Sequence, residues 1–114
     1  MSNYLDNIYI IKEDIIWDKE AEDTIVVYIK NRGFFNFVAQ KIFQKPEISK
    51  IYLDRFGSFV WLLIDGNRTI LEIAKIIKLY FGEEIEPLYE RLSKFFYILE
   101  ELKFITLKRE AWRC

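Results

Sequence analysis

The stretch between residues 53 and 74 most narrowly limits the fold, because it carries start and stop signals for two helices. Asp54 precedes an apolar segment that ends at Asp65-Gly66. An aspartate suits a helix N-cap, and a glycine tolerates the positive φ angle at which a helix ends. Thr69 and Glu72 then have the spacing of a capping box. The sequence therefore predicts a short helix, a tight turn and a second helix.

A third helix is predicted over residues 87–103, and its apolar surface is unusually wide. The centre of that surface is a stripe of Leu88, Leu92, Phe95, Leu99 and Leu102, with Tyr89 and Phe96 on one side and Ile98 on the other. At about 100° per residue the arc spans about 180°, against about 100° for a helix packed on one side. Three interpretations stay open: a helix sunk between core elements, a dimer surface, or one flank that lines a groove.

Three strands are predicted before the helices, where runs of β-branched and aromatic residues occupy residues 14–17, 24–30 and 48–54. The middle run is apolar on both faces, so we expect it to be covered on both sides. The third run alternates, which places Ile51 and Leu53 on one face and Lys50 and Tyr52 on the other. That alternation predicts a third strand with one buried face.

The remaining segments complete a single domain. Residues 1–13 have no clear period and are predicted to form a partly flexible N-terminal extension. Residues 34–43 fit a helical face better than a strand and predict a short helix before Pro46. Residues 104–108 predict a closing strand. The fold class expected for residues 14–110 is α+β: a winged-helix-like domain with a three-stranded antiparallel N-terminal sheet, three helices and a short C-terminal strand.

The composition argues against catalysis. The chain has no histidine, the commonest general base and metal ligand, and its one cysteine, Cys114, excludes an internal disulfide or a cysteine-based zinc site. No glycine-rich phosphate loop or metalloprotease motif is present. The acidic run at residues 83–86 precedes a helix, where the helix dipole favours it. We therefore expect a protein that is not an enzyme and needs no cofactor or metal.

The balance of aromatic and charged residues points to a partner. Aromatic residues make up 18% of the 114 residues, more than a small core usually needs. Residues 1–29 hold two bases and seven acids (−5), residues 30–55 six bases and two acids (+4), and residues 56–114 nine of each (0). The basic middle either attracts an acidic partner or is a solvated face. With no signal segment and no apolar run of about 20 residues, we expect a cytoplasmic protein that does not enter membranes.

The order and spacing of these elements resembles the PqqD-like family over roughly residues 24–108. The resemblance is carried by Leu53-Asp54, Gly57-Ser58-x-Val60-Trp61, Ile64-Asp65-Gly66 and Thr69-Ile70-x-Glu72-Ile73-Ala74, followed by Phe81-Gly82, Glu90-Arg91-Leu92, Phe95-Phe96, Leu99 and Phe104-Ile105. None of these residues is catalytic in the family.

Proteins of this family are winged-helix-like peptide chaperones, the recognition elements for ribosomally made, post-translationally modified peptides. The resemblance implies that the leader of a precursor peptide binds as an extra strand beside the third strand and against the third helix. It further implies that the domain presents the precursor to a modifying enzyme, often a radical S-adenosylmethionine enzyme, and performs no chemistry itself.

The peptide-binding residues implied by the resemblance lie on that strand and that helix. They are Ile48, Lys50, Ile51, Tyr52 and Leu53 on the strand and Tyr89, Leu92, Phe95, Phe96 and Leu99 on the helix. Lys50, Arg91 and Lys94 are expected to meet acidic residues of the leader. If Phe96 lines the groove, Phe96→Ala should weaken peptide binding more than it lowers stability.

Two other functions remain open on the sequence. The excess of aromatic residues would also suit a structural domain that forms a homodimer or larger homo-oligomer. A winged-helix DNA-binding protein needs a basic stripe. The helical half has no net charge, and its third helix carries Glu90, Glu100 and Glu101. We therefore expect no nucleic-acid partner.

Overall fold

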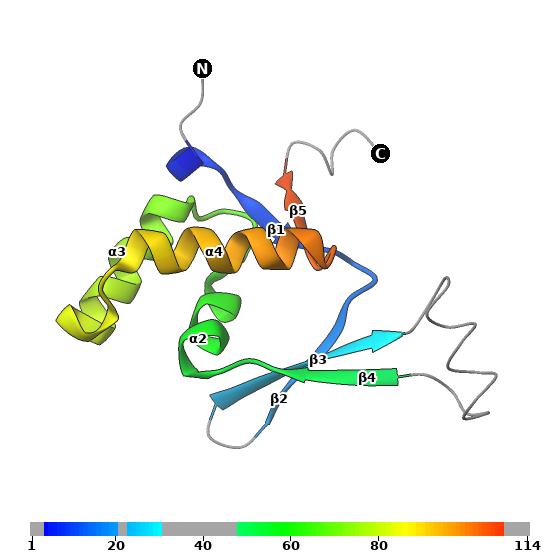
Figure 1. Cartoon of the computed structure of the whole chain (residues 1–114). Coiled ribbons are helices and arrows are strands. Elements are labelled where there is room, and N and C mark those ends of the chain that lie inside the picture. The colour runs from blue at the N-terminus through cyan, green and yellow to red at the C-terminus, as the bar shows by residue number, and fades with distance from the viewer. Residues whose placement is uncertain (1–3, 21–22, 31–47, 109–114) are drawn as a thin grey trace.

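A three-stranded antiparallel sheet and a layer of three helices form the body of the molecule (Figure 1). The computed structural model describes residues 4–20, 23–30 and 48–108, with backbone alone for Lys30, Ile48 and Ser49. The predictions for residues 34–43 and for Cys114 lie outside these residues. Within them, the predicted α+β class, the antiparallel sheet, the three helices and the C-terminal strand are confirmed.

The sheet has the strand order β2-β3-β4 and therefore two edges. Its strands are β2 (Ile16–Glu20), β3 (Thr24–Lys30) and β4 (Ile48–Tyr52). β2 begins two residues later than the strand predicted at residues 14–17 and ends three residues later. Trp17, Val27 and Ile51 share one row across the sheet. Ile25 and Val27 belong to the main core cluster, and Val26 on the opposite face is buried as well, so β3 is covered on both sides as expected.

The helices lie where the sequence predicted them, although the first ends at Leu63, before the predicted stop at Asp65-Gly66. They are α2 (Arg55–Leu63), α3 (Ile70–Phe81) and α4 (Leu88–Glu101), with a 3₁₀ turn, η3 (Gly82–Ile85), before α4. Asp54 Oδ1 accepts a hydrogen bond from the Gly57 N–H at 2.7 Å. Thr69 and Glu72 form the predicted capping box. Gly66 has a φ of 81°, which suits glycine better than any residue with a Cβ atom.

Residues 4–11 are part of the fold, whereas the sequence predicted a partly flexible extension over residues 1–13. A 3₁₀ turn, η1 (Tyr4–Asp6), leads into β1 (Tyr9–Ile11), which pairs antiparallel with β5 (Ile105–Leu107). The Tyr9 ring is buried and stacks on Phe96 with centroids 5.2 Å apart. A three-residue strand is too short to show a period, and its partner lies at the far end of the chain, so local sequence could not reveal it.

The buried Tyr9 should make the free energy of unfolding fall at alkaline pH. Its hydroxyl donates to Glu100 Oε1 at 3.3 Å, and burial, reinforced by the Glu100 charge, raises the pKa of Tyr9. The unfolded chain ionises this tyrosine near pH 10. The folded chain holds the proton to higher pH, so the stabilisation is complete below about pH 10 and is lost as the pH rises further. Urea unfolding from about pH 8 to 11 should show a steeper alkaline loss in the wild type than in Tyr9→Phe. Parallel curves would contradict this assignment.

Ser58 ties the start of α2 to the sheet. The Ser58 hydroxyl is buried, accepts from the Ile25 N–H at 2.9 Å and donates to the Leu53 carbonyl at 3.1 Å. It thereby takes the place of a ladder hydrogen bond where β4 leaves the sheet.

Removing the Ser58 hydroxyl should lower the free energy of unfolding by more than the loss of one small side-chain group suggests. Ser58→Ala leaves the buried Ile25 N–H without its partner, so we expect a loss of about 1–3 kcal/mol in the free energy of unfolding. Chemical denaturation measures the loss, and the Ile25 amide should exchange faster in the variant. An unchanged exchange rate at Ile25 would show that another group satisfies this amide.

Candidate functional site

The outer edge of β4 presents unpaired backbone groups. The Leu53 N–H donates to the Ile25 carbonyl at 2.9 Å. Partners in an antiparallel pair alternate between bonded and non-bonded, so Ile51 also bonds across to Val27. The N–H and C=O groups of Lys50 and Tyr52 then point away from β3, toward the free edge. These two residues are the ones that an additional strand would meet.

The side chains of β4 alternate as predicted. Ile51 and Leu53 pack against the core cluster, whereas Lys50 and Tyr52 are exposed on the other face of the sheet. The Lys50 ammonium lies 5.8 Å from the centroid of the Tyr28 ring on the neighbouring strand. Only the backbone of Ile48 is described, and it continues the strand. Of the predicted strand residues, Ile51 and Leu53 therefore pack in the core, whereas the side chains of Lys50 and Tyr52 are accessible.

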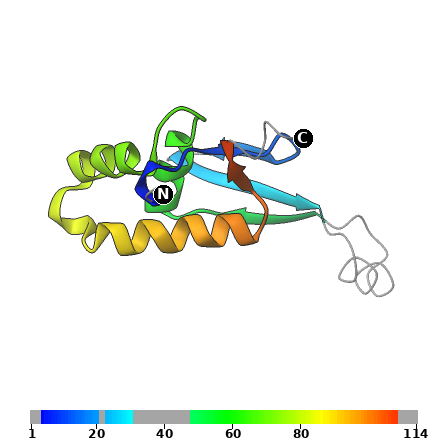
Figure 2. The same ribbon diagram turned by 90° about the horizontal axis from the view of Figure 1, so that it is seen from above.

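α4 lies over the β4 side of the sheet, with β2 on the far side (Figures 1 and 2). The flank of α4 that turns toward the start of α2 begins with Arg91 and Phe95, and Ile98 and the C-cap residue Leu102 continue the same stripe at the spacing i, i+4, i+7, i+11. Phe95 is half-buried, and Ile98 and Leu102 remain 46% and 44% exposed. We call these four residues the α4 flank. It is an apolar surface with one cation at its end and no described element packed over its second half.

The helix residues predicted to line the groove are not together on this flank. Leu92, Phe96 and Leu99 are at most 1% exposed and form part of the core, so a bound peptide could not reach their side chains. Tyr89 is exposed on the opposite side of α4. Of the five predicted helix residues only Phe95 turns toward Phe56, at the start of the helix that comes after β4. The wide arc combined a core face with two flanks, and helical spacing could not tell which flank would face the sheet.

Sequence reasoning placed Ile98 and Leu102 on the helix but assigned them no role at the site. A usable signal existed, because Arg91, Phe95, Ile98 and Leu102 share one stripe at helical spacing. The sequence did not show on which side of the helix the core lies. In the structure Tyr9 packs on Phe96 on one side of α4, and Phe56 packs on Phe95 on the other.

An aromatic pair closes the Tyr52 end of this region. Phe56, at the start of α2, meets Phe95 edge to face with centroids 6.1 Å apart. The Arg91 guanidinium lies 5.2 Å from the Phe56 centroid, and its Nη1 donates to the Ile85 carbonyl at 3.4 Å. A Cβ atom at Gly57 would come within 3.1 Å of Phe95, so glycine allows this close approach. The end of the edge therefore carries packed aromatic rings and the Arg91 cation.

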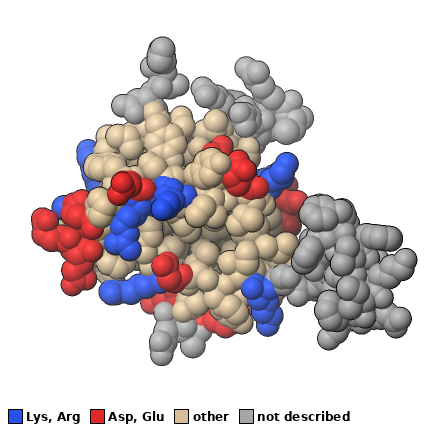
Figure 3. Space-filling model, viewed as in Figure 1, with Lys and Arg blue, Asp and Glu red and all other residues tan. Residues whose placement is uncertain are grey.

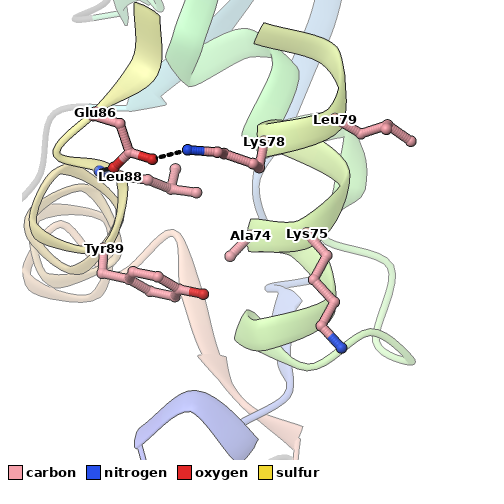
Figure 4. Close-up of a pocket in the computed structure, with 7 residues that line it drawn as sticks. All are labelled: Ala74, Lys75, Lys78, Leu79, Glu86, Leu88 and Tyr89. Carbon is pink, nitrogen blue, oxygen red and sulfur yellow. Dashed lines mark hydrogen bonds and ion pairs between the residues drawn. The ribbon is translucent and has the colours of Figure 1, made fainter. Parts of the chain in front are cut away.

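A hollow lies between α3 and α4, on the Tyr89 side of α4 (Figure 4). Ala74 and Leu88 form its buried floor, and Tyr89 projects across it toward α3. Lys78 hydrogen-bonds Glu86 at one end, which lowers the pKa of Glu86 and raises the pKa of Lys78. The rest of the lining consists of Lys75 and Leu79 from α3.

Charged side chains are unevenly distributed over the surface. On the face seen in Figure 3, acidic side chains gather at one end, over the connection between α3 and α4 that holds Glu83, Glu84 and Glu86. Much of the middle of this face is uncharged. Among the described residues no group of three or more acidic or cysteine side chains could hold a metal ion. None of the described helices has the length and apolar character of a membrane span.

No protein-family model, curated protein or solved structure matches this chain significantly. An assignment of function therefore rests on the residues of the β4 edge and the α4 flank.

Proposed function

We propose that this chain is a non-catalytic peptide-binding domain of the PqqD-like, winged-helix type. It takes the leader of a ribosomally made precursor peptide as an extra strand along β4 and presents the precursor to a modifying enzyme in the cytoplasm. A radical S-adenosylmethionine enzyme is the partner that the family resemblance suggests. The wall of the binding groove is the α4 flank, which keeps Phe95 from the helix residues first predicted and replaces the other four.

One observation carries the proposal: the N–H and C=O groups of Lys50 and Tyr52 point to the free edge of β4, which is the edge of the sheet nearer to α4 in Figure 2. An added strand would satisfy these groups, and each backbone hydrogen bond contributes about 0.5–1.5 kcal/mol. Strand addition of this kind takes affinity from the backbone and specificity from pockets for alternate side chains. The α4 flank supplies an apolar wall for one set of those side chains.

The other edge of the sheet is less suited to strand addition. β2 carries Asp18, Lys19 and Glu20 in succession, and Lys19 pairs with Asp23 at 3.1 Å. Charged side chains along an edge discourage pairing with another strand. The described part of β4 has Lys50 as its one charged residue. The proposal therefore places the ligand at β4.

An NMR titration tests the proposal. The ¹⁵N-labelled chain is titrated with the leader peptide encoded beside its gene, with a scrambled peptide as the control. We expect amide shifts at Lys50 and Tyr52 and at Phe95, Ile98 and Leu102, because these line the proposed groove. Leu79 and Tyr89, which flank the α3–α4 hollow, should move little. Amides of β4 that stay still at near-millimolar peptide would reject the proposal, and light scattering would then test a homodimer through the same edge.

A further inference from the structure

The Tyr52 end of the β4 edge carries a cation that is positioned but not neutralised. Arg91 is held by the face of Phe56 and by the Ile85 carbonyl, and neither group is charged. Among the described residues no carboxylate forms an ion pair with Arg91. The nearby Asp54 already accepts the Gly57 N–H as the cap of α2. A guanidinium fixed in this way keeps donors free for a ligand, and its fork geometry matches a carboxylate.

We propose that the strand bound along β4 carries a carboxylate side chain, from Asp or Glu, where it passes the Phe56–Phe95 pair, and that Arg91 binds it. This inference rests on the proposed function, since it requires a strand at β4. It names the class of ligand: an extended segment with apolar residues facing Ile98 and Leu102, followed at the Tyr52 end by an acidic residue.

The arrangement along α4 supports this order. The α4 flank begins with Arg91 and continues through Phe95 to the partly exposed Ile98 and Leu102. Phe56 lies four residues after the end of β4, so its contacts with Phe95 and Arg91 place this end of the flank near the segment that leaves the C-terminal end of β4. A strand has a repeat of about 6.6 Å for every second residue, which allows successive inward side chains to meet these positions in turn.

Lys94 provides a matched control. It is also basic and exposed on α4, three residues after Arg91, but it lies about 60° around the helix from Arg91, on the side away from Phe95. It makes no cation–π contact with a described ring. If general positive charge attracts the ligand, Arg91 and Lys94 should matter equally. If the fixed guanidinium binds one carboxylate, only Arg91 should matter.

A random display library of peptides of about ten residues, enough to cover a strand with its flanks, supplies the probe. Peptides selected on the wild-type chain should contain an Asp or Glu at one end of an apolar segment. The best peptide and its Asp→Asn or Glu→Gln counterpart are then compared on the wild type, Arg91→Gln and Lys94→Gln. The acid should bind about tenfold more tightly than the amide on the wild type and on Lys94→Gln, as expected for a charge-assisted fork. On Arg91→Gln the two should bind alike, and the amide peptide should bind all three proteins equally, which shows that each is folded.

Two results would overturn the inference and separate it from the proposed function. If peptides shift the Lys50 and Tyr52 amides but show no acid preference, or keep it on Arg91→Gln, the carboxylate site is wrong and strand addition stands. If no selected peptide shifts those amides, strand addition at β4 is wrong and the carboxylate site is rejected with it.

Discussion

Phe96→Ala should lower the free energy of unfolding by about 3–5 kcal/mol, the usual cost of removing a buried phenylalanine. The Phe96 ring is fully buried, stacks on Tyr9 and contacts Phe95 edge to face at 6.4 Å between centroids. Domains of this size have a total stability of about 5–15 kcal/mol, so a large share would be lost. Urea unfolding followed by circular dichroism measures the change.

Tyr97→Ala is the matched control for this prediction. Tyr97 follows Phe96 on α4 but is 63% exposed, so its removal should change the stability by about 0.5 kcal/mol or less. The expectation from sequence was that Phe96→Ala would chiefly weaken peptide binding, and the burial of Phe96 reverses that order. If Phe96→Ala unfolds like the wild type and binds peptide poorly, Phe96 lines the groove and is not a core residue.

The second large effect concerns two neighbouring residues of β4. Tyr52→Pro removes an N–H that faces the free edge, whereas Ile51→Pro removes one that bonds to β3. Proline is tolerated on the open side of an edge strand but not where a ladder bond is needed. We therefore expect Tyr52→Pro to stay folded and lose peptide binding, and Ile51→Pro to lose about 2–4 kcal/mol of stability.

Thermal unfolding and the peptide titration together separate the two outcomes. Tyr52→Phe is the control, because it changes the exposed side chain and keeps the backbone donor. If Tyr52→Pro binds the peptide as well as Tyr52→Phe does, the ligand does not pair with this edge. Equal destabilisation by both proline variants would mean that the hydrogen-bond phase of β4 differs from the one inferred from Leu53 and Ile25.

The elements of this protein were largely predictable from local sequence, whereas the candidate site was predictable only in outline. Asp54 and the Thr69–Glu72 pair mark helix starts through contacts within a few residues, and such contacts are visible in the sequence. β3 and β4 are long enough to show their patterns. β1 is not, and its partner, β5, is separated from it by most of the chain.

The prediction of the site was wrong about which flank of α4 faces away from the core. Leu92, Phe95, Phe96 and Leu99 have the same apolar character, and helical spacing orders them around the axis without saying where the core lies. Tyr9 and Phe56 supply that direction, one on each side of α4. Because Tyr9 belongs to the unpredicted strand, the error at the site follows from the error at the N-terminus.

Local chemistry thus accounts for the order of strands and helices, the caps that bound α2 and α3, and the alternation of β4, since each depends on residues close together in the chain. The open edge at Lys50 and Tyr52, the burial of Phe96 and the placement of Arg91 over Phe56 arise from contacts between distant segments. Those contacts depend on how the elements pack around one core, and no local pattern in the chain specifies that packing.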